Sequence, residues 1–202
     1  MKKKLVISTF VALVFSSLAF SQSETTYTID NTKSTFTWVG KKPTGEHTGT
    51  VKFSSGNAIF NKNNLTAGTI EMDMSSIECT DLTGEYKDKL VGHLKSEDFF
   101  STDKFKTATL KITKAVFLKD SKTKNNYEIT ADLTIKGISH SITFAAMVFI
   151  NENGEMITNA EFDIDRTLYD IKFMSLKFFS EIGDKFIEDK FNVRIRLVGA
   201  KK

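Results

Sequence analysis

Residues 127–136 have the sequence YEITADLTIK, in which apolar and polar side chains alternate. In an extended chain, Tyr127, Ile129, Ala131, Leu133 and Ile135 point to one side, and the residues between them point to the other. The stretch therefore predicts a β-strand with one buried face and one face in water.

The same two-residue period recurs along the chain and predicts further strands. It is carried by Phe36 and Trp38, by Ile70, Met72 and Met74, by Leu110 and Ile112, by Phe162 and Ile164, and by Val193, Ile195 and Leu197. Short strands are also expected near residues 50–54, 57–61, 140–150 and 171–174. Asn153-Gly154 is typical of a tight hairpin turn, and the polar run from Lys119 to Asn126 is typical of a longer hairpin loop.

One stretch has a clear helical period. Between Gly84 and Leu94, the apolar residues Tyr86, Leu90 and Leu94 recur every four residues among Lys and Glu. A weaker helical turn is expected at residues 176–182. Eight or more antiparallel strands with a lone helix predict an all-β closed barrel or sandwich. Closure is favoured because it removes exposed strand edges, which the single Pro of the chain cannot protect.

The first residues are typical of a signal peptide. Three lysines, Lys2 to Lys4, precede an apolar run of 11 residues from Leu5 to Phe15, which is short for a membrane span. Small residues around Ser21 suit cleavage after it, with cleavage after Ala19 as the close alternative. We therefore expect a signal peptide at residues 1–21, one domain at residues 22–202, no stable membrane anchor, and a periplasmic or secreted protein.

The charge balance excludes several classes of partner. The chain of 202 residues has 28 basic and 25 acidic residues. Removal of residues 1–21 takes away three lysines and no acid, so the mature chain carries 25 of each sign. The two signs are interleaved, as in Lys87-Asp88-Lys89, which argues against nucleic acid and against a polybasic membrane patch.

Catalytic and metal-binding patterns are not found in the sequence. Cys79 is the one cysteine, so an intrachain disulfide and a cysteine-rich zinc site are excluded. His47, His93 and His140 are spread along the chain, and none has a second histidine at the spacing of metal ligands. We expect no catalytic residues, no metal and no cofactor.

The inward face of the predicted strands is unusually rich in Phe and Met, and a barrel of eight strands is just wide enough to be filled by side chains or to hold one small ligand. The sequence leaves both interiors open, although the flexible thioether of Met suits an adaptable apolar cavity. The candidate ligand-binding residues are Phe36, Trp38, Phe53, Met72, Met74, Leu94, Phe99, Phe100, Leu110, Ile112, Ile129, Leu133, Phe144 and Phe162.

Several motifs are more specific. They are Ser34 to Trp38, Gly40 to Gly49 (GKKPTGEHTG), Asp73 to Ile77 (DMSSI), Leu90 to Ser96 (LVGHLKS) with Asp98-Phe99-Phe100, Leu133 to Ile138, and Asp165-Arg166-Thr167. Together they resemble the YceI-like family of periplasmic lipid-binding proteins, and the resemblance spans about residues 27–198. The chain departs from the family pattern where Lys106 follows Phe105 and where Asp170 and Met174 follow Tyr169, which leaves the length and the headgroup of a ligand open.

The resemblance implies an extended antiparallel, eight-stranded barrel of lipocalin-like architecture with one short helix. Characterised family members hold a long polyisoprenoid, such as the tail of a quinone, inside the barrel. The resemblance therefore implies non-catalytic binding, storage or transport of a long apolar lipid. His47, His93 and Arg166 match motif positions, where they could contact a polar headgroup or fasten loops to the rim, and for His93 we favour the structural role.

Two other functions remain open at this stage. An enzyme acting on a lipid or an amide would use His93 with Asp98 as acid and base. A structural or stress-induced module would have a barrel filled with side chains. The sequence does not decide between a monomer and a homodimer, nor whether the protein touches a membrane transiently.

Overall fold

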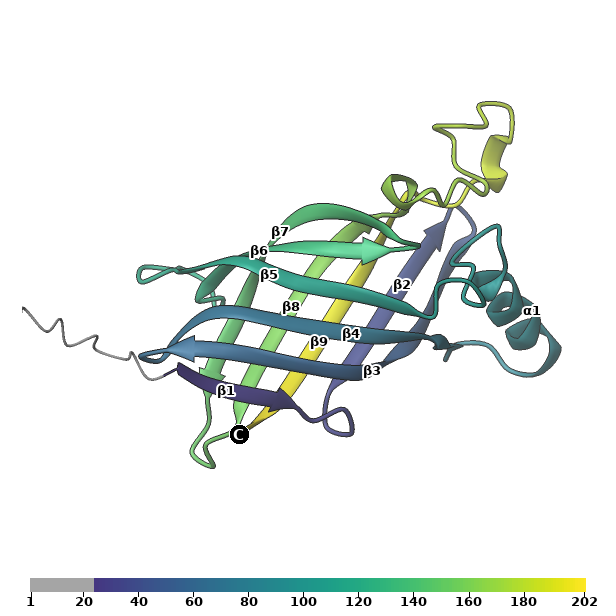
Figure 1. The fold of residues 1–202 in the computed structure, drawn as a ribbon. Helices are drawn as coiled ribbons and strands as arrows, with labels where there is room; N and C mark the ends of the chain where they lie inside the picture. Colours follow the sequence, from purple (N-terminus) through teal and green to yellow (C-terminus); the bar gives the residue numbers. More distant parts are fainter. Residues whose placement is uncertain (1–23) are drawn as a thin grey trace, which may run out of the picture.

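The alternating stretches form nine antiparallel strands of one sheet in a computed structural model that describes residues 24–202 (Figure 1). The predicted signal peptide and its cleavage site lie outside the described residues. The strands are β1 (Glu24–Ile29), β2 (Thr35–Lys42), β3 (Gly45–Asn61), β4 (Asn64–Cys79), β5 (Thr107–Phe117), β6 (Tyr127–Ile135), β7 (Ile138–Ile150), β8 (Met156–Asp165) and β9 (Lys190–Lys201).

The sheet closes into a barrel with eight strand positions. Its order is β1-β3-β2-β9-β8-β7-β6-β5-β4, and the additional pairings β3–β4 and β1–β9 leave no open edge between the first and last strands. β1 and β2 occupy one position in succession, because each pairs with both β3 and β9. Asp30 turns the chain between them by accepting hydrogen bonds from Thr32 and Lys33. The predicted eight-stranded, antiparallel, lipocalin-like barrel is confirmed.

The predicted helix and both predicted turns are also present. α1 (Gly84–Lys95) follows β4 and packs against it through its apolar side, with Leu94 buried. The hydroxyl of Ser96 donates to the carbonyl of His93 at 2.8 Å and ends the helix. Asn153-Gly154 lies in the turn between β7 and β8, and residues 118–126 form the loop between β5 and β6. Among residues 24–202, no helix is both long and apolar enough to cross a membrane.

Two local predictions are wrong. Residues 171–174 form no strand, because Asp170 adopts a left-handed conformation at φ 57° and turns the chain away from the sheet. Residues 176–182 form turns instead of a helical segment, and only a short 3₁₀ helix, η2 (Gly183–Lys185), follows them. Both stretches belong to the long connection between β8 and β9, which begins with the 3₁₀ helix η1 (Arg166–Tyr169) and projects beyond the barrel near α1 (Figure 1).

The end of the barrel away from α1 is filled with side chains. Tyr27 and Phe60 meet edge to face with ring centroids 5.3 Å apart, and the hydroxyl of Tyr127 accepts a hydrogen bond from the backbone N–H of Leu65 at 3.2 Å. Met156 fills the space beside Gly199, where an added Cβ would approach its methyl group to 3.1 Å. The buried rings and the buried hydroxyl fix the packing of this end.

Candidate functional site

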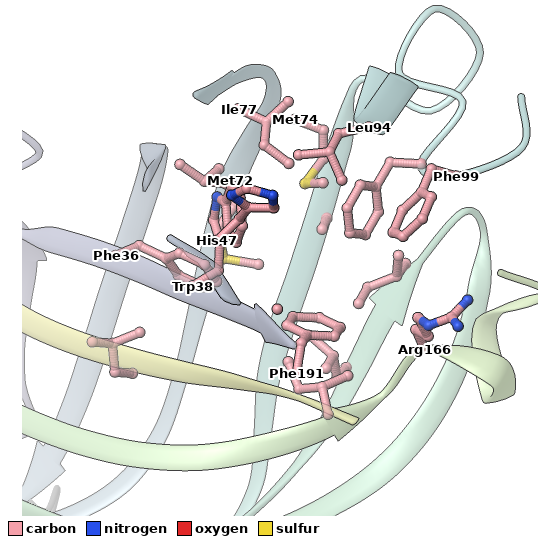
Figure 2. A pocket seen from close by; sticks show the side chains of 18 of the residues that line it. Phe36, Trp38, His47, Met72, Met74, Ile77, Leu94, Phe99, Arg166 and Phe191 are labelled. Carbon is pink, nitrogen blue, oxygen red and sulfur yellow. The ribbon is translucent and has the colours of Figure 1, made fainter. Parts of the chain in front are cut away.

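The interior near α1 contains an apolar cavity of about 230 Å³. Its wall combines side chains of the barrel strands with Leu90, His93 and Leu94 of α1, and with Ile187 and Glu188 of the connection between β8 and β9. Figure 2 shows Met72, Met74, Ile77 and Phe99 among the side chains around this space. The cavity is therefore covered at one end by α1 and by that connection, and it ends against the filled half of the barrel.

Most of the predicted ligand-binding residues lie on this wall. Eleven of the fourteen line the cavity: Phe36, Trp38, Phe53, Met72, Met74, Leu94, Phe99, Phe100, Leu110, Leu133 and Phe162. The strands place them there because each strand alternates its side chains between the interior and the outer face. The helix and the segment after it supply Leu94, Phe99 and Phe100, which are all buried.

Three predicted residues do not line the cavity. Ile129 and Phe144 are buried in the filled half, and Ile112 packs against the same core. The ring of Phe144 stacks on Phe162 with centroids 4.3 Å apart, so Phe144 backs a residue of the cavity wall without reaching the cavity itself. These three side chains point inward as predicted, but they lie farther from α1 along the barrel axis than the cavity extends.

Trp38 is a large, buried side chain of the cavity wall that carries one polar atom, the indole Nε1. It is 8% exposed, and its indole Nε1 is buried without a hydrogen-bond partner in the described part of the chain. The ring lies over Gly49, its partner across the β2–β3 pair, where an added Cβ would come within 2.4 Å of the indole and 1.8 Å of the carbonyl oxygen of Glu78. Glycine is therefore required at position 49 for the Trp38 ring to take this place.

His47 lies two residues from Gly49 on β3 and lines the cavity. Its Nδ1 is 2.8 Å from Oδ2 of Asp81. Oδ1 of Asp81 accepts from the backbone N–H of Thr48 at 2.8 Å and from the thiol of Cys79 at 3.2 Å. Burial by itself raises the pKa of the Asp81 carboxyl, but the hydrogen bonds from His47, Thr48 and Cys79 outweigh it and lower that pKa to about 2.

The charge state of Asp81 fixes the orientation of the His47 ring. A carboxylate with a pKa of about 2 is ionised at neutral pH and can only accept hydrogen bonds. Nδ1 of His47 must therefore carry the hydrogen in this contact. The other ring nitrogen, Nε2, is left for a different partner, as in sites where a carboxylate orients a histidine.

Arg166 faces the rim of the cavity but holds the chain instead of offering free donors. It is 2% exposed, and its guanidinium donates to the carbonyls of Ile171 at 2.9 Å, Ile187 at 2.9 Å and Glu188 at 3.1 Å. Desolvation lowers the pKa of this guanidinium, and the nearby carboxylate of Asp189, 3.6 Å away, counteracts the shift. Of the two roles left open for Arg166, these contacts support the fastening of a loop.

His93 packs between aromatic rings. Its ring centroid lies 4.4 Å from that of Phe173 and 5.5 Å from that of Phe99, and its Nε2 is buried without a partner in residues 24–202. Asp98 is exposed, and within the described chain no hydrogen bond or ion pair joins it to His93. The acid–base pair of the enzymatic alternative is therefore not assembled in this structure.

Sequence reasoning missed Asp81, Ile77, Ile164 and Phe191. The last three line the cavity, and Ile164 and Phe191 fit the alternation of β8 and β9. Ile77 is out of phase with Met72 and Met74, because the β3–β4 pairing shifts register between Asp73 and Glu78, so the strand pattern could not predict it. Asp81 had no signal in this pattern either, because it lies in the link between β4 and α1 and contacts His47 only in the folded chain.

Among residues 24–202, no group of three or more His, Cys, Asp or Glu side chains is arranged to hold a metal ion.

Comparison with known proteins agrees with this architecture. A family model described as the YceI-like domain matches residues 27–199. No curated protein matches the chain. Among solved structures, BcnA of Burkholderia cenocepacia is similar with a TM-score of 0.69 at 19% identity, over 85% of this chain and 99% of BcnA.

Two further solved structures share the fold. A polyisoprenoid-binding domain from Saccharophagus degradans, implicated in plant cell wall breakdown, has a TM-score of 0.62 at 15% identity, over 87% of this chain and 98% of that domain. The YCEI protein of Campylobacter jejuni has a TM-score of 0.51 at 19% identity, over 74% of this chain and 82% of that protein. At these identities the similarity establishes the fold and nothing finer.

Proposed function

The chain belongs to the YceI-like family, and from that premise we propose that it binds a long-chain apolar lipid, of the isoprenoid or quinone type, and stores or carries it without changing it chemically. One observation supports this proposal above the others: the interior of the closed barrel near α1 contains an apolar cavity of about 230 Å³ instead of being filled. The polyisoprenoid-binding domain of similar fold is consistent with it.

The energetics favour an apolar occupant. Each methylene group moved from water into such a cavity contributes about 0.8 kcal/mol, so a few prenyl units give useful affinity after the cost of ordering the chain. The flexible side chains of Met72 and Met74 on the wall can adjust to an irregular, branched chain. A polar solute would gain little, because few of the wall residues carry hydrogen-bonding side chains.

The first experiment identifies the occupant. Protein purified from its own host is extracted with organic solvent, the extract is analysed by mass spectrometry, and the delipidated protein is titrated with an apolar dye. We expect an intact apolar lipid in the extract and dye binding that the same lipid competes away. An empty extract together with no dye binding would show a filled or closed barrel and would refute the proposal.

A second experiment separates carriage from catalysis. His93→Gln keeps hydrogen-bonding capacity but loses the packing of the imidazole between Phe99 and Phe173, so we expect a lower melting temperature and an unchanged ligand. The ligand is analysed by mass spectrometry after incubation with each protein. A product made by the wild type and not by His93→Gln would show an enzyme instead of a carrier.

We also propose that the protein acts in the periplasm or beyond it, after removal of residues 1–21. The support is the basic start, the apolar run of 11 residues and the small residues near Ser21. Sequencing of the N-terminus of the protein from its host should find Gln22 or a residue close to it. Met1 on a membrane-bound protein would contradict this localisation.

Transient contact with a membrane would bring the protein to its lipid, and the connection between β8 and β9 has the surface for it. Phe173, Leu176, Phe178 and Phe179 are each at least 36% exposed. Lys172 and Lys177 lie over the Phe178 ring at 5.4 and 5.9 Å, and residues 171–179 contain no acid. The same connection supplies Ile187 and Glu188 to the cavity wall. Exposed aromatic rings beside lysines suit insertion among lipid headgroups.

Sedimentation with vesicles tests this contact. Vesicles of mixed neutral and anionic phospholipid should retain the wild type and lose the double variant Phe178→Ser/Phe179→Ser. Phe117→Ser is the matched control, because Phe117 is 51% exposed at the opposite end of the barrel. Equal retention of all three proteins would contradict the assignment, and a concentration-dependent dimer broken only by the double variant would assign the surface to a second copy.

A further inference from the structure

The β2–β3 hairpin supplies Trp38, Lys41, Lys42 and His47 to the cavity wall, and the other polar lining residues are His93, Arg166 and Glu188. In the register of this pair, Trp38 faces Gly49 and Gly40 faces His47, so the Trp38 and His47 side chains lie on the same face as diagonal neighbours (Figure 2). Diagonal neighbours across an antiparallel pair have backbones about 7–8 Å apart, within reach of long side chains. Both residues line the cavity.

Each of these side chains has one hydrogen-bonding atom to spare. Nε1 of Trp38 is a donor that is buried without a partner among residues 24–202, which is a costly state unless a ligand accepts the hydrogen bond. His47 has used Nδ1 as a donor to Asp81, so in the neutral ring Nε2 presents a lone pair. The hairpin therefore carries one unused donor and one unused acceptor on two neighbouring side chains of the cavity wall.

The geometry points to a headgroup subsite for a lipid hydroxyl, in which Trp38 Nε1–H donates to the hydroxyl oxygen and the hydroxyl donates to His47 Nε2. This inference rests on the proposed function and names the class of its ligand: an isoprenoid alcohol or a quinol, in preference to a hydrocarbon. A hydroxyl is the smallest neutral group that accepts one hydrogen bond and donates another. Asp81 is a positioning residue in this subsite, because it acts only through His47.

Neutral charge at this end of the cavity agrees with a neutral headgroup. Lys41 and Lys42 at the end of β2 line the cavity together with Glu188, and Asp81 stands behind His47. Arg166 also lines the cavity, and the carboxylate of Asp189 lies 3.6 Å from its guanidinium. Three positive and three negative groups leave no excess charge to attract a phosphate. The acyclic tail would extend from Trp38 along Phe36 and Phe53 toward the closed end, where the wall is apolar.

Three ligands with the same tail test the subsite. Delipidated protein is titrated with a C15 isoprenoid alcohol, its methyl ether and the parent hydrocarbon. The ether keeps the acceptor for Trp38 and loses the donor for His47, and the hydrocarbon loses both. We expect the alcohol to bind about fivefold more tightly than the ether, and the ether about fivefold more tightly than the hydrocarbon, one hydrogen bond at each step.

Two variants assign each of these two differences in affinity to one residue. In His47→Leu the alcohol and the ether should bind equally, and in Trp38→Phe the ether and the hydrocarbon should bind equally. Asp81→Asn should weaken the preference for the alcohol without changing the binding of the hydrocarbon. Thermal unfolding verifies that each variant is folded, and the ligand series on the wild type gives an answer even if one is not.

Trp38 is the one tryptophan of the chain, so its indole N–H gives a single, assignable signal in a ¹H–¹⁵N spectrum. The alcohol and the ether should move this proton downfield, and the hydrocarbon should not. Equal binding of all three ligands would refute the subsite and leave lipid binding intact. Tighter binding of the corresponding monophosphate than of the alcohol would also refute it. Failure of all the ligands and of an apolar dye to bind would refute the proposed function itself.

Discussion

Near α1, the inward side chains of the barrel line a cavity, while in the other half the inward side chains meet and fill the interior. Most strands run through both halves, although β1 and β2 share one position in succession and the alternation of β3 and β4 changes phase at irregularities of their pairing. In the filled half, rings meet across the interior, as Tyr27 and Phe60 do. In the cavity half, α1 and the connection between β8 and β9 cover the end of the barrel and leave space beneath them. One sheet thus provides a rigid packed base and a binding chamber, and the following changes test this division.

The two halves should differ most in their response to a charge that is introduced at a buried position. Ile129 is 2% exposed in the filled half, so Ile129→Asp should destabilise the protein by more than about 4 kcal/mol or prevent folding. Met74 lines the cavity, where water can reach a new carboxylate in the empty protein. Met74→Asp should therefore fold, with a smaller loss of stability, and should fail to retain lipid. Chemical denaturation and dye binding measure the two effects.

Thr130→Lys is the control for both substitutions, because Thr130 points to the outer face of β6 between Ile129 and Ala131. It should change stability by no more than about 0.5 kcal/mol and leave lipid binding intact. If Met74→Asp retained lipid as well as Thr130→Lys does, the chamber would not be where the lipid lies.

The boundary between the halves can be moved. The ring of Phe144 stacks behind Phe162 of the cavity wall, so Phe144→Ala should open space beyond the closed end of the chamber. We expect a loss of about 3 kcal/mol in the free energy of unfolding and a gain in affinity for a lipid one isoprene unit longer. Binding of a series of isoprenoids of increasing length measures it. An unchanged length preference would show that the boundary lies elsewhere.

The cover of the chamber depends on Arg166. Arg166→Lys keeps the charge but cannot reach three carbonyls at once, so we expect a loss of about 2 kcal/mol and faster amide hydrogen exchange in residues 171–189. The filled half should keep its protection against exchange. Uniformly faster exchange over both halves would show that Arg166 stabilises the whole barrel and not the cover alone.

The smallest effect is expected at Asp81, through pH. Its pKa in the folded protein, about 2, lies below the ordinary value of 3.8, so the ionised carboxylate stabilises the fold. That contribution is complete above about pH 4 and is lost as the pH falls through 2. The free energy of unfolding of the wild type should exceed that of Asp81→Asn by about 1 kcal/mol at pH 6, a modest value because the side chain is partly exposed. The difference should disappear only below about pH 2, where the carboxyl is protonated. A difference independent of pH would mean that Asp81 acts by packing.

Much of the fold could be predicted from particular residues. The alternation of Tyr127 to Ile135 places every buried residue of β6 correctly, and the four-residue period of Tyr86, Leu90 and Leu94 locates α1 to within one residue of its observed end. The failures at 171–174 and 176–182 share one cause. These apolar residues follow a left-handed turn at Asp170 and are held by contacts from Arg166, Ser175 and Met174, which a local pattern does not contain.

The sequence by itself determined which face of a regular strand such as β6 is inward, because the side-chain period of a strand is fixed by its backbone geometry. In β3 and β4 the inward face changes where their pairing shifts register, which the alternation does not predict. The tertiary structure decided how far along the barrel each inward residue lies, and hence that Met74 borders a cavity while Ile129 does not. That position depends on the stagger between eight strands and on what covers their ends, and both are set by contacts between residues far apart in the chain. The pairing of His47 with Asp81, 34 residues away, has the same origin.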